Sequence, residues 1–123
     1  MADPKNIVKG TRSSEILEGT SDSDRIISSG GEDTIYGYDG DDQLNGYPAS
    51  KGYIHWGSQE PLKIFGGQGD DFIVGGSDID QLFGGDGDDS IRGREGDDNL
   101  VGGIGNDKLF GLDGSDILDG GLG

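Results

Sequence analysis

Residues 66–119 consist of six consecutive blocks of nine residues: GGQGDDFIV, GGSDIDQLF, GGDGDDSIR, GREGDDNLV, GGIGNDKLF and GLDGSDILD. Every block has aspartate at its sixth place and isoleucine or leucine at its eighth, with no shift in frame. Self-similarity at a fixed short period is the sequence signature of a solenoid. We call each block a row, and we expect the row to be the unit from which the fold is built.

The same frame continues toward the N-terminus as GTRSSEILE (10–18), GTSDSDRII (19–27), SSGGEDTIY (28–36) and GYDGDDQLN (37–45), with a degenerate row before it. Residues 46–65 number twenty where two rows need eighteen, and neither row there has an acidic sixth place. We therefore expect a single domain over 1–123, with an N-terminal block (1–45), a degenerate two-row insertion (46–65) and a regular block (66–123) that ends mid-repeat.

The composition narrows the class of protein. There are 27 glycines, only 29% hydrophobic residues and a net charge of −16. This charge argues against a nucleic-acid backbone or an anionic membrane as partner, and it favours a cation. Low hydrophobicity with high charge is also typical of disorder, but disordered linkers do not keep a strict apolar period of nine. No cysteine is present, so disulfides and thiolate metal sites are excluded.

Within a row, places seven to nine are strand-like, and the glycine-rich places one to six are expected to form a turn. Side chains alternate across a strand, so the eighth place points inward while the ninth points outward. The predicted inward residues are Leu17, Ile26, Ile35, Leu44, Ile64, Ile73, Leu82, Ile91, Leu100, Leu109 and Leu118. We expect one outer face to present an apolar stripe of Ile27, Phe65, Phe83 and Val101.

The rows resemble the nonapeptide G-G-x-G-x-D-x-U-x of RTX (repeats-in-toxin) proteins. GGQGDDFIV and GGDGDDSIR fit this pattern at every place, and the resemblance covers most of the chain outside 46–65. It implies an all-β fold, a right-handed parallel β-roll of about six coils with two rows per coil. It also implies Ca²⁺ between stacked turns on the same edge, in a secreted bacterial protein exported by a type I system. The export signal would lie outside this segment, whose first thirty residues lack a signal-peptide core.

The family's ligands are the sixth-place carboxylates and the main-chain carbonyls of places two and four. Transferred to this chain, the carboxylates are Asp24, Asp33, Asp42, Asp71, Asp80, Asp89, Asp98, Asp107 and Asp116. The carbonyls are those of Gly67, Gly69, Gly85, Gly87, Gly96, Gly103, Gly105 and Gly114. Calcium suits such a site because it accepts six to eight oxygen ligands in flexible geometry.

Alternation of rows between edges assigns the ion sites. Five full sites are expected between the pairs Asp24–Asp42, Asp71–Asp89, Asp89–Asp107, Asp80–Asp98 and Asp98–Asp116, with Glu15–Asp33 as a weaker site. The insertion should interrupt both series of carboxylates. The fifth-place acids Asp41, Asp70, Asp88 and Asp97 are expected to face solvent. Asp22 and Asp78 replace the fourth-place glycine, which should alter the local carbonyl geometry.

Three functions fit these features. The first is a calcium-triggered structural and secretion-folding module that docks neighbouring domains of a larger exported protein. The second is an adhesive domain that binds a glycan or a protein through the aromatic cluster Tyr47, Tyr53, His55 and Trp56. The third is the non-catalytic part of a secreted enzyme. The chain itself is not expected to be an enzyme, because no nucleophile–base arrangement is evident, and no stretch is long enough to span a membrane.

Overall fold

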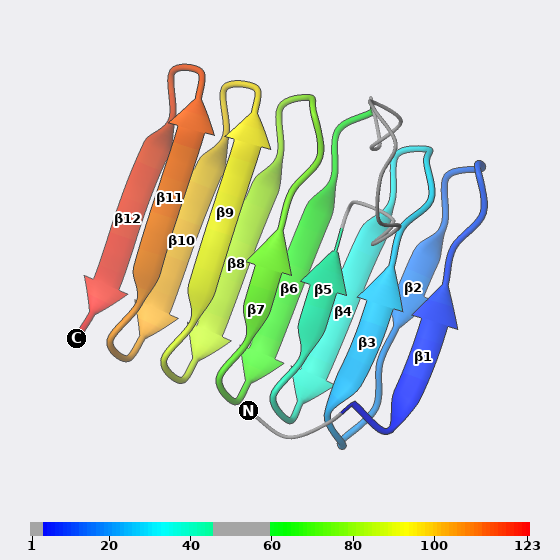
Figure 1. Ribbon diagram of the computed structural model, residues 1–123. Helices are drawn as coiled ribbons and strands as arrows, with labels where there is room; N and C mark the ends of the chain where they lie inside the picture. Colours follow the sequence, from blue (N-terminus) through cyan, green and yellow to red (C-terminus); the bar gives the residue numbers. More distant parts are fainter. Residues whose placement is uncertain (1–3, 46–59) are drawn as a thin grey trace.

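The structure is a computed structural model that describes residues 4–45 and 60–123, and in these ranges it contains twelve strands and no helix. It follows that the described residues offer no helix able to cross a membrane. The chain coils as a solenoid, so that consecutive strands lie in alternate sheets (Figure 1). Two strands complete one coil, so twelve strands make about six coils.

Each sheet has six strands. Sheet A contains β1 (Asn6–Lys9), β3 (Asp24–Ile27), β5 (Gln43–Asn45), β7 (Phe72–Val74), β9 (Ser90–Glu95) and β11 (Lys108–Asp113). Sheet B contains β2 (Ile16–Glu18), β4 (Thr34–Asp39), β6 (Lys63–Gln68), β8 (Gln81–Asp86), β10 (Asn99–Ile104) and β12 (Ile117–Leu122). All neighbouring strands are parallel, and equivalent places of the repeat face each other. The predicted all-β parallel β-roll is therefore confirmed.

The core is a single column of eighth-place side chains between the sheets. Ile26, Ile73 and Leu100 are fully buried, as are the equivalent residues of the coils between them. Leu109 is only partly buried and Leu118 is 48% exposed, because β11 and β12 form the C-terminal end of the roll and no coil covers them there. A core one residue thick explains why the protein manages with so few apolar residues.

Strand length differs between rows, which the sequence did not predict. Strands β4, β6, β8, β9, β10 and β11 run through the first three places of the following row, so only places four to six remain for the turn. The extension is held by a further ladder bond: the Gly69 amide, at place four, donates to the Asp86 carbonyl one coil later at 2.8 Å. The prediction that all of places one to six form the turn is therefore wrong for these rows.

The insertion does not occupy two rows. Strand β5 pairs directly with β7, and β4 pairs directly with β6, at offsets of 29 residues instead of the usual 18. Eleven residues are therefore extra to the coil, and Leu62 takes the sixth place of the only row that the segment contributes. Leu62 is 2% exposed and joins the core. The two-row prediction fails because twenty residues can also be divided as eleven plus nine.

The same correction changes the outer faces. Ile27 lies in β3 on sheet A, whereas Phe65, Phe83 and Val101 lie in sheet B, so the predicted stripe does not form as stated. Tyr36 takes the place assigned to Ile27. The rings of Tyr36, Phe65 and Phe83 stack nearly parallel, with centroids 5.2 and 4.9 Å apart.

Candidate metal sites

The turns line two edges of the roll (Figure 1). The Asp71 edge, along the bottom of that view, joins sheet B to sheet A and carries the sixth-place residues Asp24, Asp42, Asp71, Asp89 and Asp107. The Asp80 edge, along the top, joins sheet A to sheet B and carries Glu15, Asp33, Leu62, Asp80, Asp98 and Asp116.

Along both edges, one oxygen of every sixth-place aspartate except Asp24 accepts a backbone N–H of the preceding coil; Asp24 accepts the side-chain amide of Asn6 instead. Oδ1 of Asp89 accepts the amide N–H of Asp71, and Oδ1 of Asp98 accepts that of Asp80, both at 2.8 Å. Six further bonds of this kind span 2.8–2.9 Å, accepted by Asp33, Asp42, Asp71, Asp80, Asp107 and Asp116. The series holds each carboxylate in register with its neighbour.

The second oxygen is the chemically informative one. Oδ2 of Asp42, Asp71, Asp89, Asp98 and Asp107 is buried and has no hydrogen-bond partner. The first four of these residues are at most 1% exposed. Buried polar atoms are almost always partnered, and a buried carboxylate without a partner is costly. Five such atoms at equivalent places indicate that a cation belongs beside them.

Backbone oxygens are directed to the same gaps. A Cβ built on Gly66 would overlap both Oδ2 of Asp71 and the carbonyl oxygen of Gly84, in the next coil. A Cβ on Gly85 would likewise overlap the carbonyl oxygen of Gly67. Both Gly67 and Gly85 have positive φ, 114° and 120°. The place-two carbonyl of Gly67 and the place-one carbonyl of Gly84 therefore lie against the neighbouring turn, and ligation by the carbonyls of places two and four remains a prediction.

Burial raises the pKa of these carboxyl groups. The pKa of Asp71 rises to about 8 and that of Asp80 to about 7, chiefly through desolvation. Backbone N–H donors oppose the shift, and neighbouring carboxylates add to it. The same causes raise the pKa of Asp42, Asp89 and Asp98 to about 6. The shifts reflect the cost of burying the charged form, which a bound cation would offset.

The donor set fits calcium. No three acidic, histidine or cysteine side chains converge on one point within residues 4–45 and 60–123. Side chains would therefore supply two carboxylates per gap, with carbonyl oxygens completing the coordination sphere. Calcium accepts such mixed oxygen ligands in irregular geometry, whereas magnesium requires a tight octahedron. Ordinary zinc sites depend on cysteine or clustered histidine ligands.

The register corrects the predicted site pairs. Asp42 neighbours Asp71 directly, so the insertion leaves the carboxylates of the Asp71 edge uninterrupted. The interruption falls on the Asp80 edge alone, where Leu62 lies between Asp33 and Asp80. The pairs Asp24–Asp42, Asp71–Asp89, Asp89–Asp107, Asp80–Asp98 and Asp98–Asp116 are neighbours as predicted. Whether ions bind there remains a prediction.

The fifth-place acids form a second, outer series. Asp70, Asp88 and Asp97 are exposed, and Asp41 is half-buried. Each accepts a backbone N–H from the following coil through its Oδ1, for example Asp88 N–H to Asp70 Oδ1 at 2.8 Å. These acids therefore help to align the coils, a role that the sequence did not predict. The predicted patch of Tyr47, Tyr53, His55 and Trp56 lies outside the described residues.

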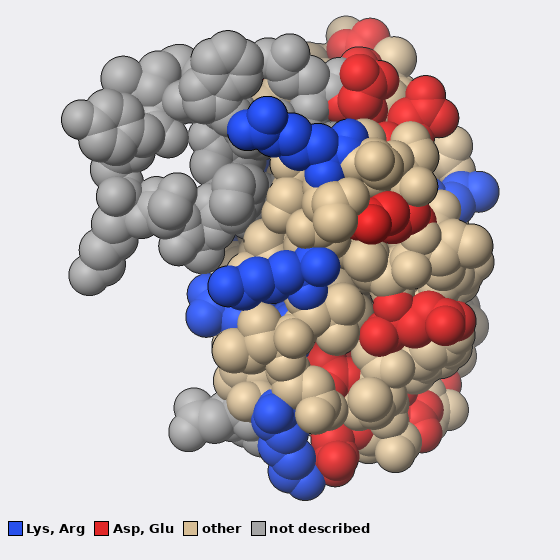
Figure 2. All heavy atoms as spheres, turned by 90° about the vertical axis from the view of Figure 1, so that its right-hand side faces the viewer, with Lys and Arg blue, Asp and Glu red and all other residues tan. Residues whose placement is uncertain are grey.

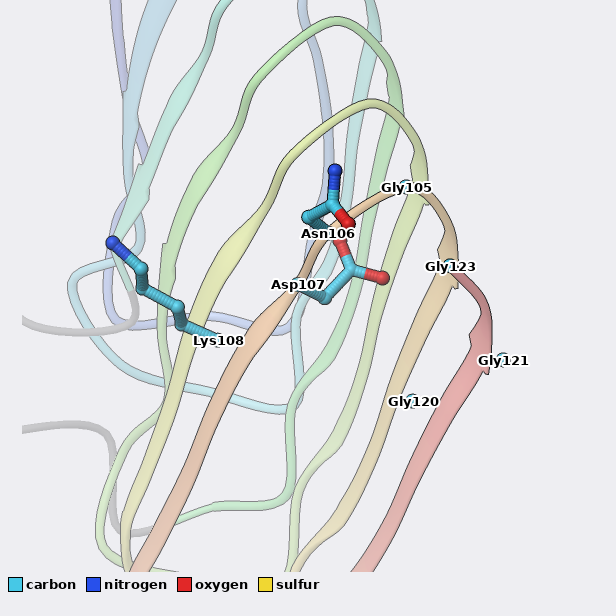
Figure 3. Close-up of a pocket in the computed structure, with 7 residues that line it drawn as sticks. All are labelled: Gly105, Asn106, Asp107, Lys108, Gly120, Gly121 and Gly123. Carbon is cyan, nitrogen blue, oxygen red and sulfur yellow. The ribbon is translucent and has the colours of Figure 1, made fainter.

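The C-terminal end of the Asp71 edge leaves an open hollow of about 440 Å³ (Figure 3). It is lined by Gly105, Asn106, Asp107, Lys108, Gly120, Gly121 and Gly123. Asp107 is the only carboxylate in the lining, so these residues supply half of a site.

The surface charge is uneven. Figure 2, seen from the end formed by β1 and β2, shows acidic side chains spread along one side and most of the visible Lys and Arg gathered on the other. With 25 acidic against 9 basic residues, uncompensated repulsion works against the compact roll.

A parallel β-solenoid with two edges of stacked, partly unpartnered carboxylates defines a class of metal-binding β-rolls. The sequence model of the RTX calcium-binding nonapeptide repeat (4 copies) matches residues 10–47, 65–100 and 92–123. The chain therefore belongs to the RTX calcium-binding repeat family. No curated protein and no solved structure matches it.

Proposed function

We propose that this chain is a structural module that folds when it binds calcium, within a larger protein exported from a bacterium. The ions bind between neighbouring turns on both edges, held by sixth-place carboxylates and turn carbonyls. The module is non-catalytic and supplies a rigid scaffold for neighbouring domains. Low cytosolic calcium would keep the module unfolded for export, and millimolar calcium outside the cell would fold it.

One observation carries the proposal: the five buried Oδ2 atoms without a partner. A fold that leaves five carboxylate oxygens uncompensated, around a core one residue thick, is poorly stable by itself. Because the site does not exist in the unfolded chain, calcium binding and folding are coupled, and the free energy of binding stabilises the fold. The pair Asp42–Asp71 extends this coupling across the insertion, because one ion there would join residues 29 apart in sequence.

A calcium titration followed by circular dichroism and size-exclusion chromatography tests the proposal. We expect an expanded, largely unfolded chain in metal-free buffer and a compact β-rich protein at about 10⁻⁴–10⁻³ M calcium. Magnesium at the same concentrations should leave the chain expanded. A cooperative β spectrum in excess chelator would show that folding does not need the metal. Compaction by magnesium at equal concentration would show that the sites are not selective for calcium.

A further inference from the structure

The ten turns that end in a carboxylate within the described residues are of two kinds. In six rows the sixth-place Oδ2 receives no hydrogen bond from its own turn; we call these open turns. They end at Asp42, Asp71, Asp89, Asp98, Asp107 and Asp116. In four rows a residue at place one or two of the same turn donates a hydrogen bond to that carboxylate; we call these closed turns. They end at Glu15, Asp24, Asp33 and Asp80.

Three of the closed turns share one contact. The place-two N–H donates to the sixth-place carboxylate: Gly76 to Asp80 Oδ2 at 2.6 Å, Thr11 to Glu15 Oε2 at 2.6 Å, and Thr20 to Asp24 Oδ2. The fourth closed turn uses a side chain, because the Ser28 hydroxyl donates to Asp33 Oδ2. A side chain at place one must meet that oxygen, as the overlap predicted for a Cβ on Gly66 shows.

Backbone geometry divides the turns in the same way. In every open turn, places two and four both have positive φ, for example Gly85 at 120° and Gly87 at 134°. In the three turns closed by an N–H, neither place does. The strand that enters an open turn has six residues, whereas the strands entering closed turns (β1, β2, β3 and β7) have three or four.

The fourth-place residue explains the difference. It is glycine in all six open turns, and it is Ser13, Asp22 or Asp78 in the three turns closed by an N–H. A non-glycine residue enters positive φ only at an energetic cost, which Tyr38, Arg94 and Leu112 bear at the second place of three open turns but no residue bears at the fourth. Because the fourth place does not enter that region, the turn takes another path, and the place-two N–H comes to face the carboxylate.

A closed turn does not suit a cation. Its N–H carries a partial positive charge on the side of the oxygen that an ion would approach, and an amide nitrogen has no lone pair to coordinate a metal. The carboxylate oxygen already accepts a hydrogen bond from its own turn. In an open turn the corresponding oxygen, buried in Asp42, Asp71, Asp89 and Asp98, has no such partner.

We propose that, in turns whose first place is glycine, the fourth-place residue decides whether calcium or the backbone partners the carboxylate; the Asp33 turn, with Ser28 at its first place and Gly31 at its fourth, lies outside this rule. This rests on the proposed function. Calcium then occupies four gaps, Asp42–Asp71, Asp71–Asp89, Asp89–Asp107 and Asp98–Asp116. The gaps Asp24–Asp42 and Asp80–Asp98 follow closed turns and bind no ion, because the first carboxylate of each pair already accepts an N–H from its own turn. Three consecutive ions then lie along the Asp71 edge and one lies on the Asp80 edge. Calcium therefore stabilises the stacking of turns on the Asp71 edge more than on the Asp80 edge.

Substitutions at Asp78 test this. D78G should open the turn before Asp80 and add one calcium per chain, measured by equilibrium dialysis at saturating calcium and by anomalous diffraction at the Asp80–Asp98 gap. D78S is the matched control: it removes the same charge, but Ser13 shows that serine at this place keeps a turn closed. D78S should bind as many ions as the wild type. D22G should add an ion at Asp24–Asp42 in the same way.

The outcomes separate the two proposals. An ion between Asp80 and Asp98 in the wild type, or equal stoichiometry in D78G and D78S, would overturn the rule while leaving calcium-driven folding intact. A wild-type chain that binds no calcium would overturn both. An additional ion in D78G and D22G, absent from D78S, would establish it.

Discussion

The amide N–H of Asp42 donates a hydrogen bond to Oδ1 of Asp71 at 2.8 Å, although 29 residues separate them. Everywhere else on the two edges the same bond joins residues 18 apart. The coils on the two sides of the insertion therefore pair in one register, with eleven residues more between them than the repeat needs.

Deletion of residues 46–56 should accordingly preserve the fold. It joins Asn45 to Gly57 and restores an unbroken period of nine. We expect calcium-induced folding, followed by circular dichroism, with a midpoint within about twofold of the wild type.

The matched control deletes nine residues, 57–65, and retains 46–56. This removes Leu62 and Ile64 from the core and the first half of β6, the strand that pairs with both β4 and β8. Folding should be lost or need far more calcium. Similar behaviour of the two deletions would mean that the register across the insertion is wrong.

Adjacent aspartates should respond differently to neutralisation. D71N removes the charge from a buried carboxylate that faces two gaps, whereas D70N removes it from an exposed acid whose Oδ1 accepts the Asp88 N–H, a role that asparagine can keep. We expect D71N to raise the calcium midpoint of folding by at least roughly tenfold, about 1.4 kcal/mol. D70N should change it by less than about twofold. A larger shift for D70N would point to ligation by the outer acids.

The raised pKa values predict opposite effects of pH on the metal-free and the calcium-bound protein. The folded pKa of Asp71 is about 8 and that of Asp42 about 6, against about 4 in the unfolded chain. Between about pH 4 and pH 8 the metal-free folded protein binds more protons than the unfolded chain. Its stability is therefore greatest below about pH 4 and falls as the pH rises toward 8. Circular dichroism in metal-free buffer should therefore show more β structure at pH 4.5 than at pH 8.

Calcium reverses this dependence, because protons compete with the ion for the same carboxylates. The calcium midpoint should rise as the pH is lowered from 8 to 5. A midpoint independent of pH would show that these carboxylates do not bind the metal.

Equivalent core positions should differ in their contribution to stability. Ile73 and Leu118 both occupy eighth places, but Ile73 is fully buried and Leu118 is 48% exposed. In saturating calcium, I73A should lower the free energy of unfolding by about 2–5 kcal/mol, and L118A should have a clearly smaller effect. Chemical denaturation measures both. Equal losses would indicate that the C-terminal coil is covered in solution.

The nine-residue period predicted the strand positions and the inward column from Ile26 to Leu100, and the resemblance to RTX repeats implied the parallel sheets and the stacking of sixth-place aspartates. It could not locate the extra residues, because a twenty-residue segment divides equally well into two irregular rows. The signal was available in GSQEPLKIF, residues 57–65, which has glycine first, Ile64 eighth and an aromatic ninth place that stacks with Phe83.

The period also could not show the partners of each carboxylate. The N–H contacts of Thr20 and Gly76 depend on the sign of φ at places two and four, and the contact of Ser28 depends on its hydroxyl group. Asp22 and Asp78 are recognisable as departures from the pattern, but only the structure shows that a backbone N–H faces the carboxylate in their turns.

The order of strands has a mechanical consequence. Strands β1 and β12 lie at opposite ends of the roll, and each coil pairs only with the coils beside it (Figure 1). Tension applied through the two ends would detach the coils one at a time. Each ordinary coil would release 18 residues, about 60 Å of extended chain, but the coil that contains the insertion would release 29, about 100 Å. A single long step among short ones would mark the insertion in a force–extension trace, and calcium would set the force at which each step occurs.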